Sequence, residues 1–366
     1  MPKRAHDVRL TWPGKASGFA GSNAGARLEP DLPESSRSNA VLIEGDNITA
    51  LRALQGLPAR ATLVYLDPPF FTQREHERVE RARGPRGVER RSFKAFDDRW
   101  ANFEQYLSEL GQRIAAAREL LAPEGCLVLH VDPKTSHYAK VLCDEIFGVE
   151  AFASEIVWRY RRWPAKTRNF QRVHDVLLRY VRDPEATPRF RQLYEPLAAS
   201  TEKTWGAGRQ RAVVNADGRR YRSSVTDEPS PGVPLGDVWD ISIIAPVARE
   251  RTGYPTQKPE ALIERLIEAC TDPLDLVIDA YAGSGTTLAV STRLGRRAIG
   301  IDQNPEAIAL TRKRLGAQGV DAFEHRVVAG PSIAQIKPER VAKTPRTATA
   351  GAPERPVGSR RVRRVA

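Results

Sequence analysis

Cysteine is scarce in this sequence, and no two cysteines have the spacing of a metal or redox motif. The three cysteines, Cys126, Cys143 and Cys270, lie far apart in apolar contexts, and none belongs to a C-x-x-C pair. The pattern excludes a disulfide framework and a zinc knuckle, so we expect three reduced thiols in the core. The six histidines show no metal-ligand spacing either, and we expect no bound metal.

Long hydrophobic runs are absent as well. No apolar stretch approaches the ~18 residues that a bilayer crossing requires, and the start, MPKRAHDVRLTWPGK, lacks the apolar core of a secretory signal. We therefore expect a cytoplasmic chain without membrane contact. Its 366 residues, 41% of them hydrophobic and 28% charged, are enough for about two folding units.

Acidic residues are outnumbered, with 45 Asp and Glu against 57 Lys and Arg, which gives a net charge of +12. Such an excess favours a polyanionic partner such as nucleic acid. More than half of it lies in residues 337–366, where nine basic and two acidic residues stand among Pro, Ala, Thr and Gly. A segment of this composition does not fold alone. The positive charge that remains on residues 1–336 is modest, so it is only weak support for a nucleic-acid partner.

Alternating strand and helix patterns predict the fold class. Short hydrophobic runs predict strands over 41–46, 61–67, 126–132, 276–279 and 296–302. Amphipathic stretches between or beside them predict helices over 47–56, 101–121 and 257–272. This alternation predicts an α/β protein with a parallel, doubly wound sheet built from both flanks of the chain.

Two polar stretches interrupt the alternation. Residues 71–99 are rich in arginine and poor in apolar side chains, and we expect a mobile loop there. From residue 153 to residue 250, the strands EIVWRYRRW and HDVLLRYVR are followed by long polar connections. We expect this second stretch to be a separate insert.

A glycine-rich turn follows the strand at 276–279. Its residues are Asp279, Tyr281, Gly283, Ser284 and Gly285, and a helix begins at Thr286. Glycine lets a ligand approach the backbone, the helix start offers free N–H groups to an anion, and Asp302 is placed to hold ribose hydroxyls. The pattern predicts a nucleoside-cofactor site, the alternative being an ordinary strand–helix turn. A dinucleotide fingerprint needs a third glycine where Ala289 stands, which disfavours a pyrophosphate ligand.

The strand at 61–67 ends in Asp67-Pro68-Pro69-Phe70. Because the prolines stiffen this corner, the Asp67 carboxylate and the Pro68 carbonyl become two acceptors that suit both hydrogens of an exocyclic amine. Phe70 supplies a stacking face for a flat heterocycle taken out of its helix. The alternative is an ordinary turn at a strand end. The combination with the glycine turn favours the catalytic interpretation.

With these motifs in this order, the chain resembles the permuted, beta-group S-adenosylmethionine-dependent amino-methyltransferases of DNA. The resemblance covers about residues 40–318 and rests on GDNITAL (45–51), DPPF (67–70), SHYAKVLCDEIFG (136–148), HDVLLRY (174–180), ERTGYPTQKPEALIERLI (250–267) and DAYAGSGTT (279–287). It implies a doubly wound, mostly parallel, Rossmann-like methyltransferase sheet that is circularly permuted and carries an inserted DNA-recognition region. Two departures are Phe70 in place of the commoner Tyr and Ala280-Tyr281 in place of Pro-Phe.

The resemblance also implies a division of roles and domains. Asp67, Pro68, Pro69 and Phe70 are expected to be catalytic. The residues expected to bind S-adenosylmethionine are Asp46, Thr256, Lys258, Asp279, Tyr281, Gly283, Ser284, Gly285, Thr286 and Asp302. The implied parts are an N-terminal arm (1–39), a catalytic half (40–152), a DNA target-recognition insert (153–250), a cofactor-binding half (251–330) and a basic, disordered tail (331–366).

The implied reaction is methyl transfer to the N6 amine of adenine in duplex DNA after base flipping. Asp67 favours adenine, because N4-cytosine enzymes of this family more often carry Ser there, and cytosine N4 is the alternative. An NAD-dependent Rossmann dehydrogenase is an alternative from another class, but it leaves the Asp-Pro-Pro-Phe corner unexplained. Guanine-N2 methyltransferases of ribosomal RNA can also carry Asp-Pro-Pro-Phe, but in them the glycine turn comes first. Here Asp67 precedes Gly283, and this order favours DNA as the substrate. The resemblance leaves open a cognate restriction endonuclease and a homodimer as partners.

Residues 155–182 are strongly basic and contain several aromatic side chains. The expected DNA contacts are Arg159, Arg161, Arg162, Lys166 and Arg168. Trp158, Tyr160 and Trp163 are interleaved with them and are expected to stack on DNA. The alternative is a basic surface that contacts only solvent.

His130 and Asp132 are two residues apart in the strand at 126–132. Their side chains are therefore expected on the same side of the sheet, near its carboxyl edge. We expect this pair to satisfy hydrogen bonds rather than to line the pocket for the target base.

Overall fold

One ten-stranded sheet organises the chain in the computed structural model, which describes residues 9–15, 18–19, 27–29, 39–56, 60–84, 87–164, 166–214, 216–320 and 323–329. Across the sheet the strands are β1 (Arg27–Glu29), β16 (Phe323–Ala329), β2 (Ala40–Glu44), β15 (Arg297–Asp302), β14 (Leu276–Asp279), β3 (Ala61–Leu66), β6 (Leu121–Val131), β8 (His174–Val181), β7 (Phe152–Arg159) and β13 (Val238–Asp240). Neighbours run parallel from β16 to β6 and between β7 and β13, whereas β8 and β1 run antiparallel to their neighbours. The mostly parallel sheet confirms the predicted α/β class. The circular permutation stays a prediction.

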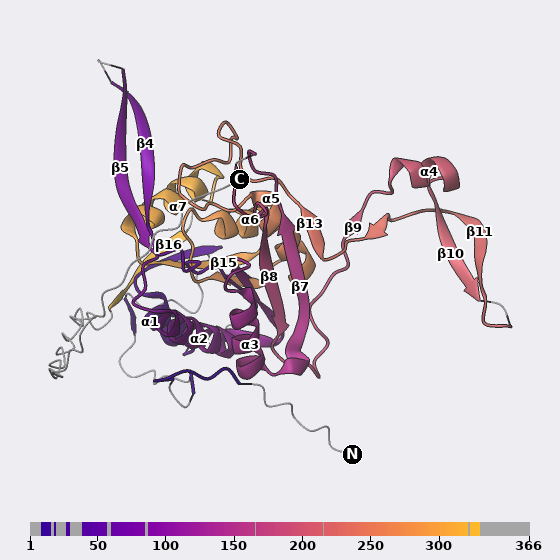
Figure 1. The fold of residues 1–366 in the computed structure, drawn as a ribbon, viewed down its shortest axis with the longest axis horizontal. Helices are drawn as coiled ribbons and strands as arrows, with labels where there is room; N and C mark the ends of the chain where they lie inside the picture. The colour runs from indigo at the N-terminus through magenta and orange to yellow at the C-terminus, as the bar shows by residue number, and fades with distance from the viewer. Residues whose placement is uncertain are drawn as a thin grey trace, which may run out of the picture. The chain divides into compact units, whose positions relative to one another are not determined.

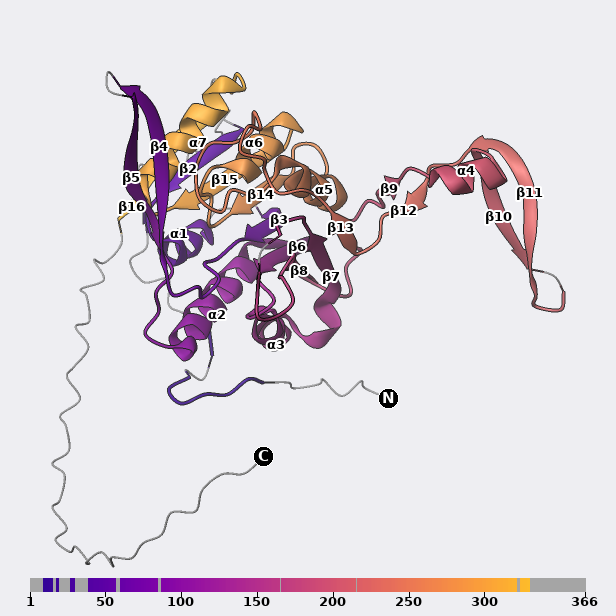
Figure 2. The same ribbon diagram turned by 45° about the horizontal axis from the view of Figure 1, so that its top comes forward.

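Helices cover both faces of this sheet, as a doubly wound fold requires (Figures 1 and 2). The first group is α1 (Asn47–Leu54), α2 (Phe103–Leu120) and α3 (Ser136–Phe147), with α2 packed against the other two. The second group is α5 (Glu260–Cys270), α6 (Thr286–Arg293) and α7 (Pro305–Ala317), with α6 packed against the other two. A short 3₁₀ helix, Val149–Ala151, follows α3.

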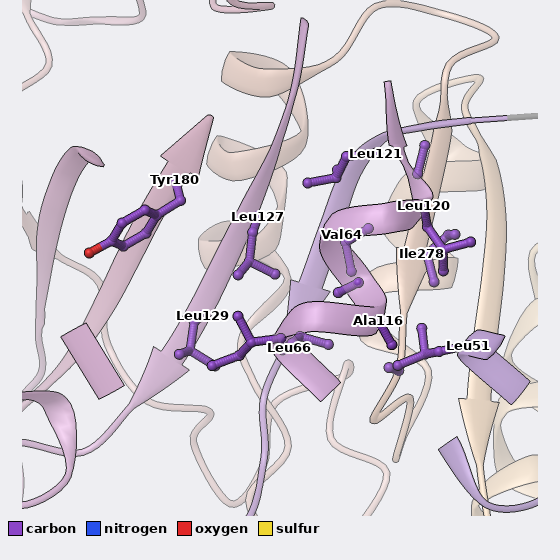
Figure 3. Close-up of a cluster of buried hydrophobic side chains, with 14 of the residues drawn as sticks. Leu51, Val64, Leu66, Ala116, Leu120, Leu121, Leu127, Leu129, Tyr180 and Ile278 are labelled. Atoms are coloured by element: carbon purple, nitrogen blue, oxygen red, sulfur yellow. The ribbon is translucent and has the colours of Figure 1, made fainter. Parts of the chain in front are cut away.

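The central strand β3 is buried along its whole length, because it has helices on both sides. Val64 and Leu66 pack with α1 and α2 in one cluster, in which Figure 3 shows Leu51 and Leu120 beside them. Leu63 and Tyr65 point the opposite way, into the cluster that contains α5. The three cysteines are buried and unpaired, which confirms that they are core thiols.

The stretch 71–99, predicted as a mobile loop, is a β-hairpin, so that prediction is wrong. Its strands β4 (Glu75–Gly84) and β5 (Gly87–Asp97) pair in antiparallel register from Glu75↔Asp97 to Gly84↔Gly87 (Figure 1). The two strands of a hairpin form backbone hydrogen bonds with each other and need no hydrophobic face. The polar composition of residues 71–99 therefore did not indicate strands. At the hairpin base, His76 stacks on Phe96 with ring centroids 4.5 Å apart.

The region predicted as a separate insert is divided between the sheet and two small ribbons. Strands β7 and β8 continue the central sheet, so residue 153 is not a boundary of that sheet. The elements β9 (Tyr194–Glu195), α4 (Ala199–Trp205), β10 (Gly208–Val214), β11 (Arg220–Pro229) and β12 (Val233–Pro234) lie outside it. Among the described residues, β10 pairs with β11 and β9 pairs with β12. The division into functional domains stays a prediction.

The predicted basic tail, like most of the predicted arm 1–39, lies outside the described residues. Among the described helices, none combines the length and apolar character needed to cross a membrane.

Candidate active site

Two neighbouring strands bring the acidic corner and the glycine turn together. β3 and β14 pair in parallel, with Asp279 opposite Tyr65, and the Ala280 N–H donates to the Tyr65 carbonyl at 3.4 Å. Parallel strands end at the same edge of a sheet. The corner that begins at Asp67 and the turn that leads to Gly285 therefore leave this edge side by side, although they lie more than 200 residues apart in sequence.

An ammonium group lies in the acidic corner. Lys258 donates from Nζ to Oδ2 of Asp67, and the same Nζ lies 5.2 Å from the centroid of the Phe70 ring. Both side chains of this ion pair are largely buried, with 9% exposed for Lys258 and 16% for Asp67. The carboxylate and the aromatic face thus converge on one positively charged nitrogen. Lys258, which is predicted as a cofactor residue, therefore lies against the carboxylate of Asp67, which is predicted as catalytic.

Behind Asp67 lies a buried polar network that sequence reasoning did not assemble. His130 is fully buried; its Nδ1 is 2.8 Å from the Tyr65 hydroxyl and 3.9 Å from Oδ1 of Asp67. Its Nε2 is 3.4 Å from Oδ2 of Asp175, whose Oδ1 accepts from the Tyr160 hydroxyl at 3.0 Å. His130 is thus hydrogen-bonded at Nδ1, as expected, whereas the contact of the buried Nε2 with Asp175 lacks hydrogen-bond geometry. The residues of this network lie far apart in sequence, and the pairing of β3, β6 and β8 brings them together. No local sequence pattern therefore predicted the network.

Burial and hydrogen bonding shift the ionisation of this network. Burial raises the pKa of Tyr65 well above its ordinary value, so the phenol stays protonated. Burial also opposes ionisation of Asp175, but the close contact with His130 and its charge outweigh this effect and hold the pKa of that carboxyl below its ordinary value. Asp132, the other half of the predicted pair, accepts from the Thr135 N–H at 3.1 Å at the start of α3. The expectation for Asp132 is thereby confirmed as well.

Asp98 fixes the backbone that follows the corner formed by Asp67, Pro68, Pro69 and Phe70. Its side chain is 1% exposed and accepts from the Phe71 N–H at 3.0 Å, the Thr72 N–H at 2.7 Å and the Trp100 Nε1–H at 2.9 Å. Phe71 and Gln73 have positive φ angles of 54° and 57°, which side chains rarely adopt. We infer that Asp98 holds this left-handed turn and so sets the direction of Phe70. No motif in the sequence singled out Asp98.

The glycine turn has the conformation for which glycine is needed. Gly283 and Gly285 have φ angles of 50° and 71°. A Cβ at Gly285 would lie 2.4 Å from Cγ2 of Thr311, so no larger residue fits there without a shift. Helix α6 begins at Thr286, as predicted, and its free N–H groups face the same edge. Ser284 and Thr286 are buried in this turn.

Side chains from distant elements hold the turn in place. Arg314 of α7 donates to the Ser284 carbonyl at 3.2 Å and to Oγ1 of Thr286 at 3.0 Å. Oγ1 of Thr286 in turn donates to the Lys258 carbonyl at 3.2 Å. Thr256, two residues before Lys258, has a positive φ of 59°. The segment 256–258 is therefore tied to the glycine turn as well as to Asp67.

A second tie links the turn to the first helix group. Asn47 Nδ2 donates to the Ala280 carbonyl at 3.1 Å, directly before the predicted cofactor residue Tyr281. Oδ1 of Asn47 accepts from Nε of Arg113 at 2.7 Å. The neighbouring Asp46 caps α1 by accepting from the Thr49 N–H at 3.0 Å.

Asp46 and Asp302 stand at the carboxyl ends of adjacent strands, since Asp302 pairs with Glu44. The Asp302 carboxylate accepts from the Gly283 N–H and the Asn304 N–H, each at 2.8 Å. Burial raises the pKa of Asp302 despite these two bonds. Each carboxylate oxygen retains a second lone pair, so ribose hydroxyls fit here in addition. The glycines, the helix start and this carboxylate together fit a nucleoside cofactor.

Asp279 is 3% exposed and accepts from the Tyr281 N–H at 2.9 Å. Burial raises its pKa to about 7, against the lowering effect of its hydrogen bonds. In the unfolded chain the Asp279 carboxyl loses its proton near pH 4. Between about pH 4 and pH 7, Asp279 therefore holds a proton in the native state that it has lost in the unfolded state. The contribution of Asp279 to the free energy of unfolding should therefore fall across this range and level off above it.

We expect Asp279→Asn to flatten this pH dependence, because the amide still accepts from Tyr281 but does not titrate. Relative to the wild type, the variant should gain up to about 4 kcal/mol between pH 4 and pH 8. Urea unfolding of both proteins at several pH values measures the difference. Parallel stability curves would show that Asp279 does not titrate in this range.

The predicted DNA contacts fall into two groups. Arg161, Arg162, Lys166 and Arg168 are exposed, and Arg159 is exposed but forms an ion pair with Asp240. Trp163 is 89% exposed, whereas Trp158 and Tyr160 are 3% and 6% exposed and pack in the core. The expectation that Trp158 and Tyr160 stack on DNA is therefore wrong. Their alternation with polar residues along β7 was the signal for a buried strand face.

The chain is similar to proteins of a known family. The DNA methylase family model (N6_N4_Mtase) matches residues 61–313. The type II methyltransferase M.HpaI of Haemophilus parainfluenzae is 27% identical over 286 residues, which are 77% of this chain and 78% of that protein. The DNA adenine methyltransferase YhdJ of Escherichia coli (strain K12) is 27% identical over 276 residues, 75% of this chain and 82% of that protein.

A solved structure shares the fold. The PvuII DNA methyltransferase, which is cytosine-N4-specific, matches with a TM-score of 0.50 at 18% identity, over 77% of this chain and 88% of that chain. The chain belongs to the DNA methylase family. It is an S-adenosylmethionine-dependent DNA methyltransferase of the class that modifies exocyclic amines, N6 of adenine or N4 of cytosine.

Proposed function

We propose that the chain methylates the N6 amine of adenine in duplex DNA, with the target base flipped into the corner formed by Asp67, Pro68, Pro69 and Phe70. Asp67 supports adenine over cytosine, because the N4-cytosine enzymes that this chain resembles more often carry Ser at that position. The match to a relative named a DNA adenine methyltransferase points the same way. The N4 amine of cytosine is the second candidate.

The observation that carries this proposal is the contact of the Lys258 ammonium with Asp67 and Phe70. An exocyclic amine that attacks a methyl group gains positive charge on its nitrogen. The position that holds the ammonium already combines an anionic acceptor with an aromatic face, which stabilises such a charge. We propose that the target amine replaces the Lys258 ammonium in this position.

The residues then have distinct tasks. The Asp67 carboxylate and the Pro68 carbonyl accept the two hydrogens of the amine and so aim its lone pair, while Phe70 stacks on the base. S-Adenosylmethionine supplies a methyl group activated by a positively charged sulfur. Asp67 stabilises the charge that develops on the amine nitrogen, and Asp67 or water then takes the proton.

The residues around the glycine turn are proposed to hold the cofactor. Asp302 and Asp46, at the ends of β15 and β2, would accept from the nucleoside part, and the N–H groups at the start of α6 would bind its carboxylate. Thr256, Asp279, Tyr281, Gly283, Ser284, Gly285 and Thr286 complete this proposed site. A cytoplasmic location, a cognate restriction endonuclease and a homodimer stay predictions.

Asp302→Ala should weaken cofactor binding by about tenfold to a hundredfold, the effect of one or two hydrogen bonds to a charged group. Isothermal titration calorimetry with S-adenosylhomocysteine measures the dissociation constant. Asp302→Asn is the matched control, because its amide oxygen can still accept one backbone N–H. An unchanged dissociation constant for the alanine variant would contradict the role of Asp302.

The target base is tested directly by transfer of tritium from labelled S-adenosylmethionine to unmethylated duplex DNA. Digestion to nucleosides and chromatography then identify the labelled base. We expect the label in N6-methyladenosine. Label in N4-methylcytosine would instead support the second candidate, and the absence of label in DNA would overturn both.

A further inference from the structure

The loop between β7 and β8, residues 160–173, is rooted at the active site. The Tyr160 N–H donates to the Val173 carbonyl at 2.8 Å and closes the loop at its base. The Tyr160 hydroxyl donates to Asp175, which contacts His130 and through it reaches Asp67. On the other side of the base, Nη1 of Arg172 is 3.2 Å from Oδ2 of Asp132, just beyond β6. Whatever the loop contacts is therefore held close to the catalytic corner.

The outer part of this loop presents two large aromatic rings to solvent. Phe170 is 98% exposed and Trp163 is 89% exposed, in contrast to the buried Trp158 and Tyr160 of the same segment. Local hydrogen bonds support both positions: Oδ1 of Asn169 accepts from the Phe170 N–H, and Nε2 of Gln171 donates to the Trp163 carbonyl, each at 2.8 Å. Two exposed rings on one loop favour a partner that offers a hydrophobic or stacking surface.

The charge of the loop identifies that partner. Residues 160–173 contain five basic residues and no acidic residue. The basic residues are Arg161, Arg162, Lys166, Arg168 and Arg172. A partner that matches both the cations and the rings carries phosphates on the outside and flat, stacked groups inside, which describes duplex DNA.

We propose that Phe170 is the wedge that enters the duplex when the target base leaves it, with Trp163 as a second stacking surface. This inference rests on the proposed function, because it needs a base that flips toward Asp67. Flipping breaks the stacking and pairing of the target base. An inserted ring replaces part of the lost stacking and blocks the return of the base, as apolar wedges do in other complexes with DNA. Opposite an abasic site the target base has no partner to return to, so the contribution of the wedge should be largest where the target base is paired and small where it is not.

This dependence on pairing gives a test. Phe170→Ala and the wild type are compared on an oligonucleotide duplex that carries the methylated sequence, mapped by modification-sensitive sequencing of plasmid DNA treated with the wild type. In one duplex the target base is normally paired, and in the other it faces an abasic site. We expect Phe170→Ala to lose at least tenfold in methylation rate on the paired duplex and to stay within about twofold of the wild type on the abasic duplex.

Two further proteins control the experiment. Leu274→Ala removes another exposed hydrophobic side chain, at 73% exposed, from outside the loop and the predicted insert. Leu274 precedes the amino end of β14, opposite the end that leads to the glycine turn, and its substitution should leave both rates unchanged. Phe170→Trp keeps a stacking ring and should restore most of the rate. Because Phe170 is almost fully exposed, its alanine variant should fold normally, and circular dichroism verifies this.

A second readout does not depend on catalysis. A duplex with 2-aminopurine at the target position becomes fluorescent when that base leaves the stack, and we expect Phe170→Ala to abolish most of the increase seen with the wild type. Equal rate losses on both duplexes, or no loss on either, would overturn the wedge while leaving the proposed function intact. A wild-type protein that methylates neither duplex nor plasmid DNA would overturn the proposed function itself, and the wedge with it.

Discussion

Asp67→Ala is expected to lower the rate of methyl transfer by about 10²–10⁴ while leaving cofactor binding within a fewfold of the wild type. The carboxylate is the anionic acceptor of the corner, and its removal leaves only the Pro68 carbonyl to orient the amine. It also leaves the Lys258 ammonium, 9% exposed, without its carboxylate partner in the corner, which opposes the charge that develops on the amine.

Single-turnover methylation and calorimetry with S-adenosylhomocysteine separate the two effects. Glu264→Ala is a matched control, because Glu264 is also ion-paired, at 2.9 Å, but its partner is Arg293 of α6 and the pair links α5 to α6. Asp67→Ala combined with Lys258→Met tests the electrostatic part, and some of the lost rate should return. Near-normal turnover by Asp67→Ala alone would remove Asp67 from the catalytic mechanism.

Asp98→Ala is expected to have the largest effect on stability, about 3–5 kcal/mol of unfolding free energy, together with at least a tenfold loss of rate. The substitution leaves the N–H groups of Phe71, Thr72 and Trp100 without their buried acceptor. The positive φ angles of Phe71 and Gln73 then lose the contacts that maintain them. Relaxation of this turn moves Phe70, which directly precedes it.

The adjacent Asp97 provides a close control. Its carboxylate pairs with Arg99 at the exposed base of the hairpin, and such surface pairs contribute about 1 kcal/mol or less. Denaturant unfolding and methylation assays on Asp97→Ala and Asp98→Ala measure the contrast. Similar effects of the two substitutions would mean that Asp98 has no special role in holding the corner.

The sequence predicted the parts of the fold that depend on local pattern. The hydrophobic run at β3 and the turn at Gly283 and Gly285 are local signals, because burial on both faces and positive φ each require particular residues. The hairpin β4–β5 was missed because its pairing depends on backbone hydrogen bonds and leaves no hydrophobic alternation across its arginine-rich strands.

The rest of the site depends on contacts between distant segments. Tyr65, His130 and Asp175 come from three strands, and only their order in the sheet brings them together behind Asp67. Asp98 follows a polar hairpin, and its backbone pairs with Gln73 and Arg74 across the base of that hairpin, a contact between segments about 25 residues apart. Lys258 was recognised through a family motif, but its contact with Asp67 could not be read from the sequence because nearly 200 residues separate them.

The most direct measurement is the position of the target amine in a crystal structure of this protein with S-adenosylhomocysteine and its duplex substrate. We predict the N6 nitrogen of a flipped adenine within hydrogen-bond distance of both the Asp67 carboxylate and the Pro68 carbonyl, with the cofactor at the glycine turn and Lys258 displaced from Asp67. A target amine bound elsewhere, with Lys258 still paired to Asp67, would contradict this account.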